Sequence, residues 1–125
     1  MSSGHVVTRR VSLAKCDRLM KLKIEGVLLR MQQPLELPPS LIKFALKNTQ
    51  LSEDPMKTPK NLPKLKILHL KYVHGFGSKI DCSGTDSFPQ LQVLRLNGLF
   101  GLEELIEEEV MGMPTLKQVT IDPGL

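Results

Sequence analysis

Few side chains in this sequence could carry covalent chemistry. A cysteine thiolate becomes a nucleophile when a histidine takes its proton, and Cys82 follows His69 and His74 closely in the sequence. Such pairs are expected by chance in a chain with two cysteines and three histidines. The phosphate-loop, Cys-x-x-Cys, His-Glu-x-x-His and Gly-x-Ser-x-Gly motifs are absent from the sequence. We therefore predict that the protein is not an enzyme and has no catalytic residue.

Acidic side chains could instead bind a metal ion. Glu107, Glu108 and Glu109 are consecutive, in a segment whose apolar residues recur at helical spacing. Consecutive residues on a helix point in different directions, so these carboxylates would not converge on one cation. We predict a solvated acidic helix face, with no metal site and no cofactor-binding residue.

The composition indicates where such a protein works. The formal net charge is +4 over 125 residues, which is too small by itself to predict nucleic-acid binding. Cys16 and Cys82 are far apart in the sequence, and free thiols suit a reducing compartment. Residues 1–10 lack the apolar core of a signal peptide, and no apolar run is long enough to span a membrane. The expected location is cytoplasmic.

A repeated pattern organises the chain. The order Pro-x-Leu-x-x-Leu-x-Leu begins at Pro39, Pro63, Pro89 and Pro114, and a copy without the proline begins at Leu19. The first leucines of the five copies are 22, 24, 26 and 25 residues apart. This pattern and spacing are typical of leucine-rich repeats. We predict an α/β fold, a leucine-rich-repeat solenoid with short parallel strands on the concave face and irregular loops and short helices on the convex face.

The pattern also predicts the boundaries of domains and elements. Residues 1–18 are expected to be a partial repeat or a disordered N-terminal end, and residues 19–125 a domain of about five repeats with an uncapped C-terminus. A convex helix is expected at 102–111, and a helix of about one turn starts at Ser52 and is limited by Pro59. Residues 78–87 are expected to form an irregular loop. Strands are expected at about residues 21–25, 41–47, 65–71, 91–97 and 116–122.

Alternation within these strands places charged residues on one face. The aliphatic residues point into the core, and the residues between them point outward on the concave side. Six of the fifteen outward residues are Lys or Arg, and two are acidic. A basic face would speed the docking of an acidic partner, whereas lysines that merely keep a strand face soluble are the alternative explanation. The candidate partner-binding residues are Lys21, Lys23, Lys43, Lys47, His69, Lys71 and Arg95.

Several segments resemble one protein family. Residues 37–46 and 50–56, which read Leu-Pro-Pro-Ser-Leu-Ile-Lys-Phe-Ala-Leu and Gln-Leu-Ser-Glu-Asp-Pro-Met, are similar to the repeat domain of plant coiled-coil nucleotide-binding leucine-rich-repeat (NB-LRR) disease-resistance proteins. Residues 62–68 and 88–96 resemble the same family. The resemblance spans about residues 19–122. It implies an intracellular immune-receptor domain whose partner is a pathogen effector or the nucleotide-binding domain of the same receptor.

Three functions remain open at this stage. The first is a non-catalytic protein-interaction module that contributes to pathogen recognition and the defence response. The second is a generic intracellular repeat scaffold or adaptor, unconnected with immunity. The third is a nucleic-acid-binding surface, but the concave face lacks the aromatic residues that single-strand binding favours, so no nucleic acid is expected as a partner.

Overall fold

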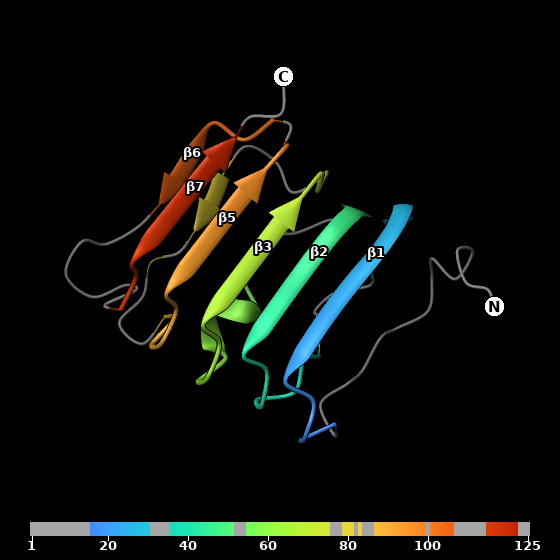
Figure 1. Ribbon diagram of the computed structural model, residues 1–125. Helices are drawn as coiled ribbons and strands as arrows, with labels where there is room; N and C mark the ends of the chain where they lie inside the picture. Colours follow the sequence, from blue (N-terminus) through green and yellow to red (C-terminus); the bar gives the residue numbers. More distant parts are fainter. Residues whose placement is uncertain are drawn as a thin grey trace.

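A computed structural model describes residues 16–30, 36–51, 55–75, 79–81, 83, 87–99, 101–106 and 115–122. Five strands form one sheet in the order β1-β2-β3-β5-β7, and every neighbouring pair is parallel (Figure 1). The predicted set of parallel strands is therefore confirmed. The strands are β1 (Lys21–Arg30), β2 (Lys43–Gln50), β3 (Ile67–Lys71), β5 (Val93–Asn97) and β7 (Gln118–Asp122).

The same backbone contacts recur at the start of successive strands. The amides of Lys66 and Ile67 both donate to the carbonyl oxygen of Ile42, at 2.8 and 3.1 Å. The carbonyl of Lys66 receives the same paired contact from the next strand, and the carbonyl of Gln92 receives it from the strand after that. Because the contact repeats, equivalent residues of neighbouring copies of the pattern lie side by side.

Two hydroxyl side chains add to these junctions. Ser40 donates to the carbonyl oxygen of Leu19 at 2.5 Å, and Thr115 donates to that of Leu91 at 2.8 Å. Both hydroxyl residues follow the proline of their copy of the pattern. Each hydroxyl satisfies a carbonyl in the preceding copy, which holds the two turns together.

The leucines of the pattern form a continuous core on one side of the sheet. The inward positions of β2, β3 and β5 and the leucine before each of these strands are almost completely inaccessible to solvent. Complete burial of one such side chain contributes roughly 1.5–3 kcal/mol, so no single copy of the pattern could be stable alone. These residues are Leu41, Phe44, Leu46, Leu65, Leu68, Leu70, Leu91, Leu94 and Leu96.

The sheet is less well covered at β7. Val119 and Ile121 occupy the positions that Leu94 and Leu96 occupy in β5, yet they are 46% and 53% exposed. Among the described strands of the main sheet, β7 pairs with β5 alone. The predicted domain limits, 1–18 and 19–125, remain predictions, and residues 1–15 lie outside the described part of the chain.

The prediction of a convex helix at 102–111 is wrong at the centre of that segment. Residues Glu104–Ile106 form a strand, β6, which pairs in parallel with β4, Lys79–Asp81. The helical spacing of apolar residues is a local signal, and pairing with a strand more than twenty residues away overrides it. The expected irregular loop at 78–87 therefore contains a strand. Residues 107–112 lie outside the described residues.

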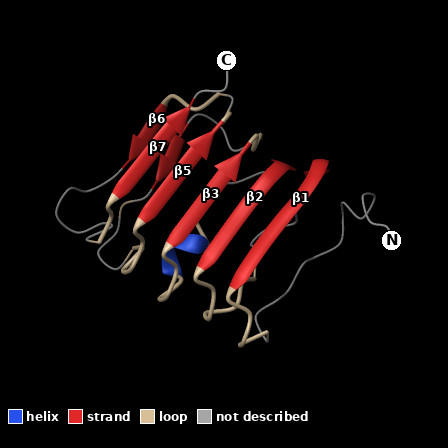
Figure 2. Ribbon diagram, viewed as in Figure 1, coloured by secondary structure: helices blue, strands red, loops and turns tan. Residues whose placement is uncertain are grey.

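Helix is scarce in the described residues (Figure 2). The short 3₁₀ helix η2, Pro59–Asn61, lies behind the sheet with Pro59 in its first turn. Proline suits that place because its missing amide would have no helical partner there. Pro59 therefore begins a helix, and the prediction that it limits a helix from Ser52 is wrong at this point. Residues 52–54 lie outside the described residues.

A buried hydroxyl in β2 carries a stability prediction. Thr49 is completely inaccessible to solvent, and its Oγ1 has no hydrogen-bond partner among the residues that the structure describes. Replacement by valine keeps the branched shape and removes the unpaired hydroxyl. We expect Thr49→Val to raise the free energy of unfolding by about 1 kcal/mol, measured by urea denaturation. Thr49→Ser, which keeps the hydroxyl, should be destabilising, and a less stable Thr49→Val protein would contradict the prediction.

Candidate functional site

The outward residues of the five strands align in three rows across the sheet. The register pairs each residue with its equivalent on the next strand, so the rows follow directly from the repeated pattern. The first row is Lys21, Lys43, Ile67, Val93 and Gln118; the second is Lys23, Ala45, His69, Arg95 and Thr120; the third is Glu25, Lys47, Lys71, Asn97 and Asp122.

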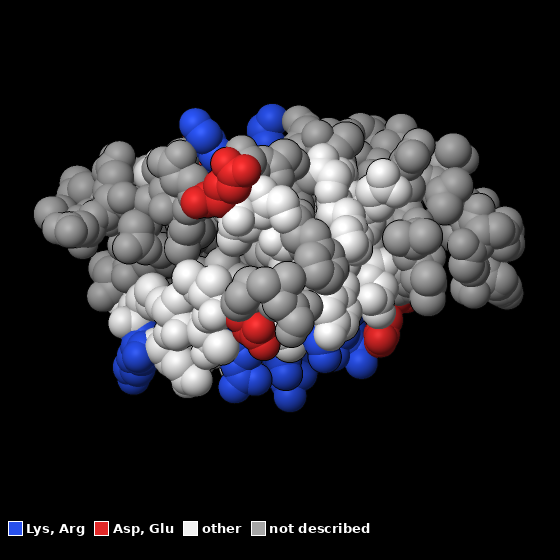
Figure 3. All heavy atoms as spheres, turned by 90° about the horizontal axis from the view of Figure 1, so that it is seen from above, with Lys and Arg blue, Asp and Glu red and all other residues white. Residues whose placement is uncertain are grey.

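Positive charge is unevenly distributed over these rows. Strands β1, β2 and β3 supply five outward lysines, β5 supplies Arg95, and β7 supplies no cation. In a view from above, most of the Lys and Arg side chains that can be seen gather along one side of the molecule, and a few lie on the opposite side (Figure 3). Lys23 has an acidic neighbour, since its Nζ lies 3.6 Å from Oε1 of Glu25. Both groups are well exposed, so this pair contributes little to stability.

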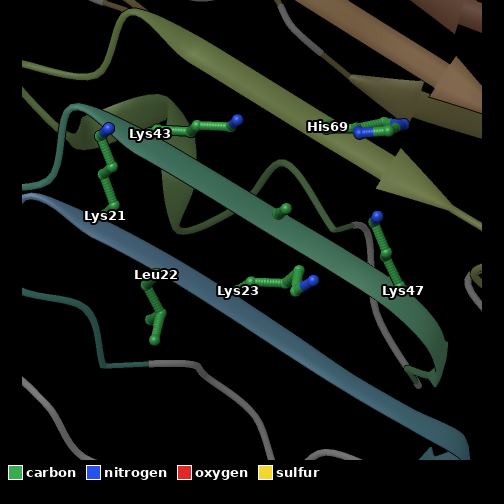
Figure 4. A pocket seen from close by; sticks show the side chains of 7 residues that line it. Lys21, Leu22, Lys23, Lys43, Lys47 and His69 are labelled. Atoms are coloured by element: carbon green, nitrogen blue, oxygen red, sulfur yellow. The ribbon is translucent and has the colours of Figure 1, made fainter.

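The cations surround a hollow centred on Ala45. This alanine is the smallest outward residue of the three rows and is only 4% exposed. The side chains of the four lysines and His69 stand around it on the outward side of the sheet, whereas Leu22 points away from them toward the core (Figure 4). The hollow is open to solvent and has a volume of about 420 Å³. Its lining consists of Lys21, Leu22, Lys23, Lys43, Ala45, Lys47 and His69.

His69 is held in a defined orientation at the edge of the hollow. Its Nε2 donates to Oδ1 of Asn97 at 2.8 Å, which leaves Nδ1 as the second ring nitrogen. Burial lowers the pKa of the His69 imidazole below its ordinary value of 6.5, and the hydrogen bond to Asn97 opposes this effect. The nearby cations Lys47, Arg95 and Lys71 lower the pKa further. His69 is therefore mostly neutral at pH 7.

The structure brings five of the seven candidate residues to one place. Lys21, Lys23, Lys43, Lys47 and His69 all line the hollow. The other two lie beside it: Lys71 pairs with Lys47 on the neighbouring strand, and Arg95 pairs with His69. The Nζ of Lys71 also lies 5.4 Å from the centre of the Tyr72 ring. Their role in binding a partner remains a prediction.

Two contributors to the site were missed from the sequence. The alternating pattern predicts that Ala45 faces outward, but its role as the floor of a hollow follows from the lysines on either side of it. The sequence did contain a signal, because Ala45 is the only alanine among fifteen outward positions. The same pattern predicts that Asn97 faces outward, but its hydrogen bond to His69 depends on the register of β3 and β5.

The residues considered for chemistry are not gathered into a site in the described part of the chain. Cys82 and Glu107–Glu109 lie outside the described residues. Within the described residues, no three His, Cys, Asp or Glu side chains are close enough together to hold a metal ion. The same part of the chain contains no helix with the length and apolar character needed to cross a membrane.

Comparisons with known proteins identify relatives of this chain. It is 36% identical over 108 residues to the probable disease resistance RPP8-like protein 4 of Arabidopsis thaliana, and 41% identical over 119 residues to the probable disease resistance protein RF9 of the same plant. It is 28% identical over 117 residues to the ToMV resistance protein Tm-2(GCR236) of Solanum lycopersicum. These alignments cover 84%, 95% and 91% of the chain.

The aligned region is a small part of each relative. It represents 12% of RPP8-like protein 4, 10% of RF9 and 14% of Tm-2(GCR236). No family model matches the chain, and no solved structure matches it. The similarity is consistent with the leucine-rich-repeat region of NB-LRR proteins. Over most of its length, this chain is a homologue of one segment of plant disease-resistance proteins.

Proposed function

We propose that this chain is a non-catalytic protein-interaction module that contributes to plant disease resistance. Its role is to present the basic outward face of β1, β2 and β3 to an acidic protein surface in the cytoplasm. The observation that carries this proposal is the alignment of five lysines and Arg95 on one sheet face, in a chain homologous to disease-resistance proteins. The partner is a pathogen effector or the nucleotide-binding domain of a resistance protein.

The repeated architecture supports this function. Paired amide contacts recur at the start of successive strands, and equivalent leucines are buried in each copy of the pattern. We infer that these copies form a leucine-rich-repeat solenoid, in which the parallel sheet is the concave face. Such a face is wide and presents side chains from many strands at once, which suits the recognition of another protein.

Electrostatics decides how the face would act. Exposed lysines that face solvent attract an opposite charge over roughly 10 Å at moderate ionic strength. They therefore raise the rate of encounter and fix the orientation of the partner more than they raise affinity. A nucleic-acid partner is not favoured, because none of the fifteen outward residues is Phe, Tyr or Trp.

Charge reversal on the face tests the proposal. The double variant Lys43→Glu/Lys47→Glu should weaken binding to the purified nucleotide-binding domain of an NB-LRR disease-resistance protein by roughly ten-fold, mostly through slower association. The measurement is surface-based binding kinetics at low and at physiological salt. The difference between variant and wild type should shrink as salt rises, because salt screens exposed charges.

A matched variant controls for net charge. Lys57 lies in the turn before η2, and Lys79 is in β4 of the second sheet. Both are exposed, and neither belongs to a strand of the main sheet. Each double reversal lowers the formal net charge equally, from +4 to zero. Lys57→Glu/Lys79→Glu should leave binding nearly unchanged. Equal losses of binding affinity in the two double variants, or no loss in either, would contradict the proposal for this partner.

A further inference from the structure

We propose that the Ala45 hollow is a binding site for a compact polyanion that carries several phosphate groups. This site is distinct from a protein-docking role of the whole sheet face, because it concerns one open hollow and a small ligand. The hollow, its ring of lysines and the position of His69 carry the inference.

The shape of the site follows from one small residue among large ones. Lys43 and Lys47 lie two positions on either side of Ala45, so all three side chains share one face of β2. Lys23 and His69 pair with Ala45 from the two neighbouring strands. A methyl group in this position leaves a space of about 420 Å³, which lies within the range of small-ligand sites, roughly 300–1,000 Å³.

The charge of the lining selects the ligand. Four ammonium groups surround the hollow, and none of the described residues that line it is acidic. Glu25 lies beside the lining, with its Oε1 3.6 Å from the Nζ of Lys23, and offsets part of this charge. Lysine acts as a compact point charge and is a common phosphate ligand, while the fork of an arginine matches carboxylate and phosphate alike. The one arginine of the face, Arg95, lies outside the lining. A ligand with one negative charge would leave most of the positive charge unbalanced, so a compact ligand with several phosphate groups fits better.

Like charges lie next to one another in the free site. Lys21 lies directly opposite Lys43 on the neighbouring strand, and like charges in this arrangement are destabilising. A bound polyanion would remove that repulsion and would bind the folded protein alone. Its binding should therefore raise the temperature of unfolding as the ligand concentration rises.

His69 links the site to pH. Its Nε2 is occupied by Asn97 of β5, so a second proton must go to Nδ1. The cations that face the ring are Lys47 of β2, Lys71 of its own strand and Arg95 of β5. Bound phosphate groups would offset these cations and favour the protonated ring. Protonation would then accompany binding, and the contribution of His69 to affinity should rise as the pH falls from 8 to 6.

Inorganic tripolyphosphate is the probe, and its binding to the whole chain is measured by calorimetry. The wild type should bind it far more tightly than it binds orthophosphate, because several charges are neutralised together. Ala45→Leu fills the hollow and leaves every charge in place. Outward aliphatic residues are tolerated on this face, as Ile67 and Val93 show. This variant should lose roughly ten-fold or more in affinity, while Lys57→Glu/Lys79→Glu should lose little.

Each outcome has a defined meaning. Weak or absent binding of tripolyphosphate to the folded wild type overturns the inference. An unchanged affinity for tripolyphosphate in a folded Ala45→Leu protein also overturns it, because it would mean that the basic face attracts the anion without a defined site. If Ala45→Leu does not fold, Lys43→Gln/Lys47→Gln takes its place, with the same expected loss. A hexaglutamate peptide that binds as tightly as tripolyphosphate, with the same dependence on Ala45, would assign the hollow to acidic protein segments and overturn the small-ligand inference.

The pH arm uses a second matched variant. Tripolyphosphate itself gains charge as the pH rises, so the wild type is compared with His69→Gln at each pH. The wild type should gain affinity at pH 6 relative to His69→Gln, and the two should converge at pH 8. The binding of a nucleotide-binding domain to Ala45→Leu is measured separately. If this variant loses tripolyphosphate binding but still binds the domain, the result supports the small-ligand site and leaves the docking role intact.

Discussion

Replacing Phe44 with alanine should lower the free energy of unfolding by roughly 3–5 kcal/mol. Phe44 is completely buried and sits in β2 between Leu22 of β1 and Leu68 of β3. Its removal leaves a cavity at the point where three neighbouring strands contribute to one core. Small domains have a free energy of unfolding of only about 5–15 kcal/mol, so this single change should remove a large part of the protein's stability.

Urea or thermal unfolding measures the effect, and two variants of the same strand provide the comparison. Phe44→Leu keeps most of the apolar volume and should cost much less, roughly 1 kcal/mol. Lys43→Ala changes the exposed neighbour on the opposite face and should cost less than about 0.5 kcal/mol. A Phe44→Ala protein as stable as Lys43→Ala would contradict the burial of Phe44 in a shared core.

Replacing Gly75 with alanine should cost roughly 2–4 kcal/mol. Gly75 has a φ of +88°, in the left-handed region, and an added Cβ would lie 2.2 Å from the carbonyl oxygen of Leu51. The neighbouring backbone cannot move away freely, because the amide of Leu51 donates to the carbonyl oxygen of His74 at 2.8 Å. Relief of the clash would therefore break a connection between two turns of the chain.

Gly98 provides the matched control for that variant. Its φ of +60° is also left-handed, but the equivalent positions one and two repeats earlier are Tyr72, with a φ of 56°, and Asn48, with a φ of 54°. This turn therefore accepts residues with side chains. A Cβ on Gly98 would approach Cδ1 of the partly exposed Tyr72 ring at 2.4 Å, and a ring at the surface can rotate. Gly98→Ala should cost less than Gly75→Ala in the same unfolding assay, and the reverse order would refute this explanation.

The sequence determined the main sheet and its two faces. The order Pro-x-Leu-x-x-Leu-x-Leu fixes which side chains are buried, since each copy needs its neighbours to cover its leucines. The structure aligns the copies as expected, so Lys43, His69 and Arg95 project from the outward face. Relatives among plant disease-resistance proteins agree with the resemblance seen in the sequence. The main sheet and its two faces depend only on residues that recur at a regular spacing, and such spacing can be recognised in a single sequence.

The tertiary structure decided the features that lie outside the repeated pattern, namely an additional strand and a left-handed turn. The strand at Glu104–Ile106 exists because it pairs with Lys79–Asp81, and no local pattern predicts a partner so far away. The left-handed turn at Asn48, Tyr72 and Gly98 is set by the path of the backbone, since these three residue types share no common preference.

The hollow at Ala45 belongs to the same class of features. Every residue of its lining is visible in the sequence, but a hollow is defined by the height of neighbouring side chains across three strands. The bond between His69 and Asn97 likewise requires the register of β3 and β5. Spacing along the chain determined which residues face outward. Only the packing of the strands decided which of these residues meet, because contacts between side chains on different strands depend on how the strands are aligned.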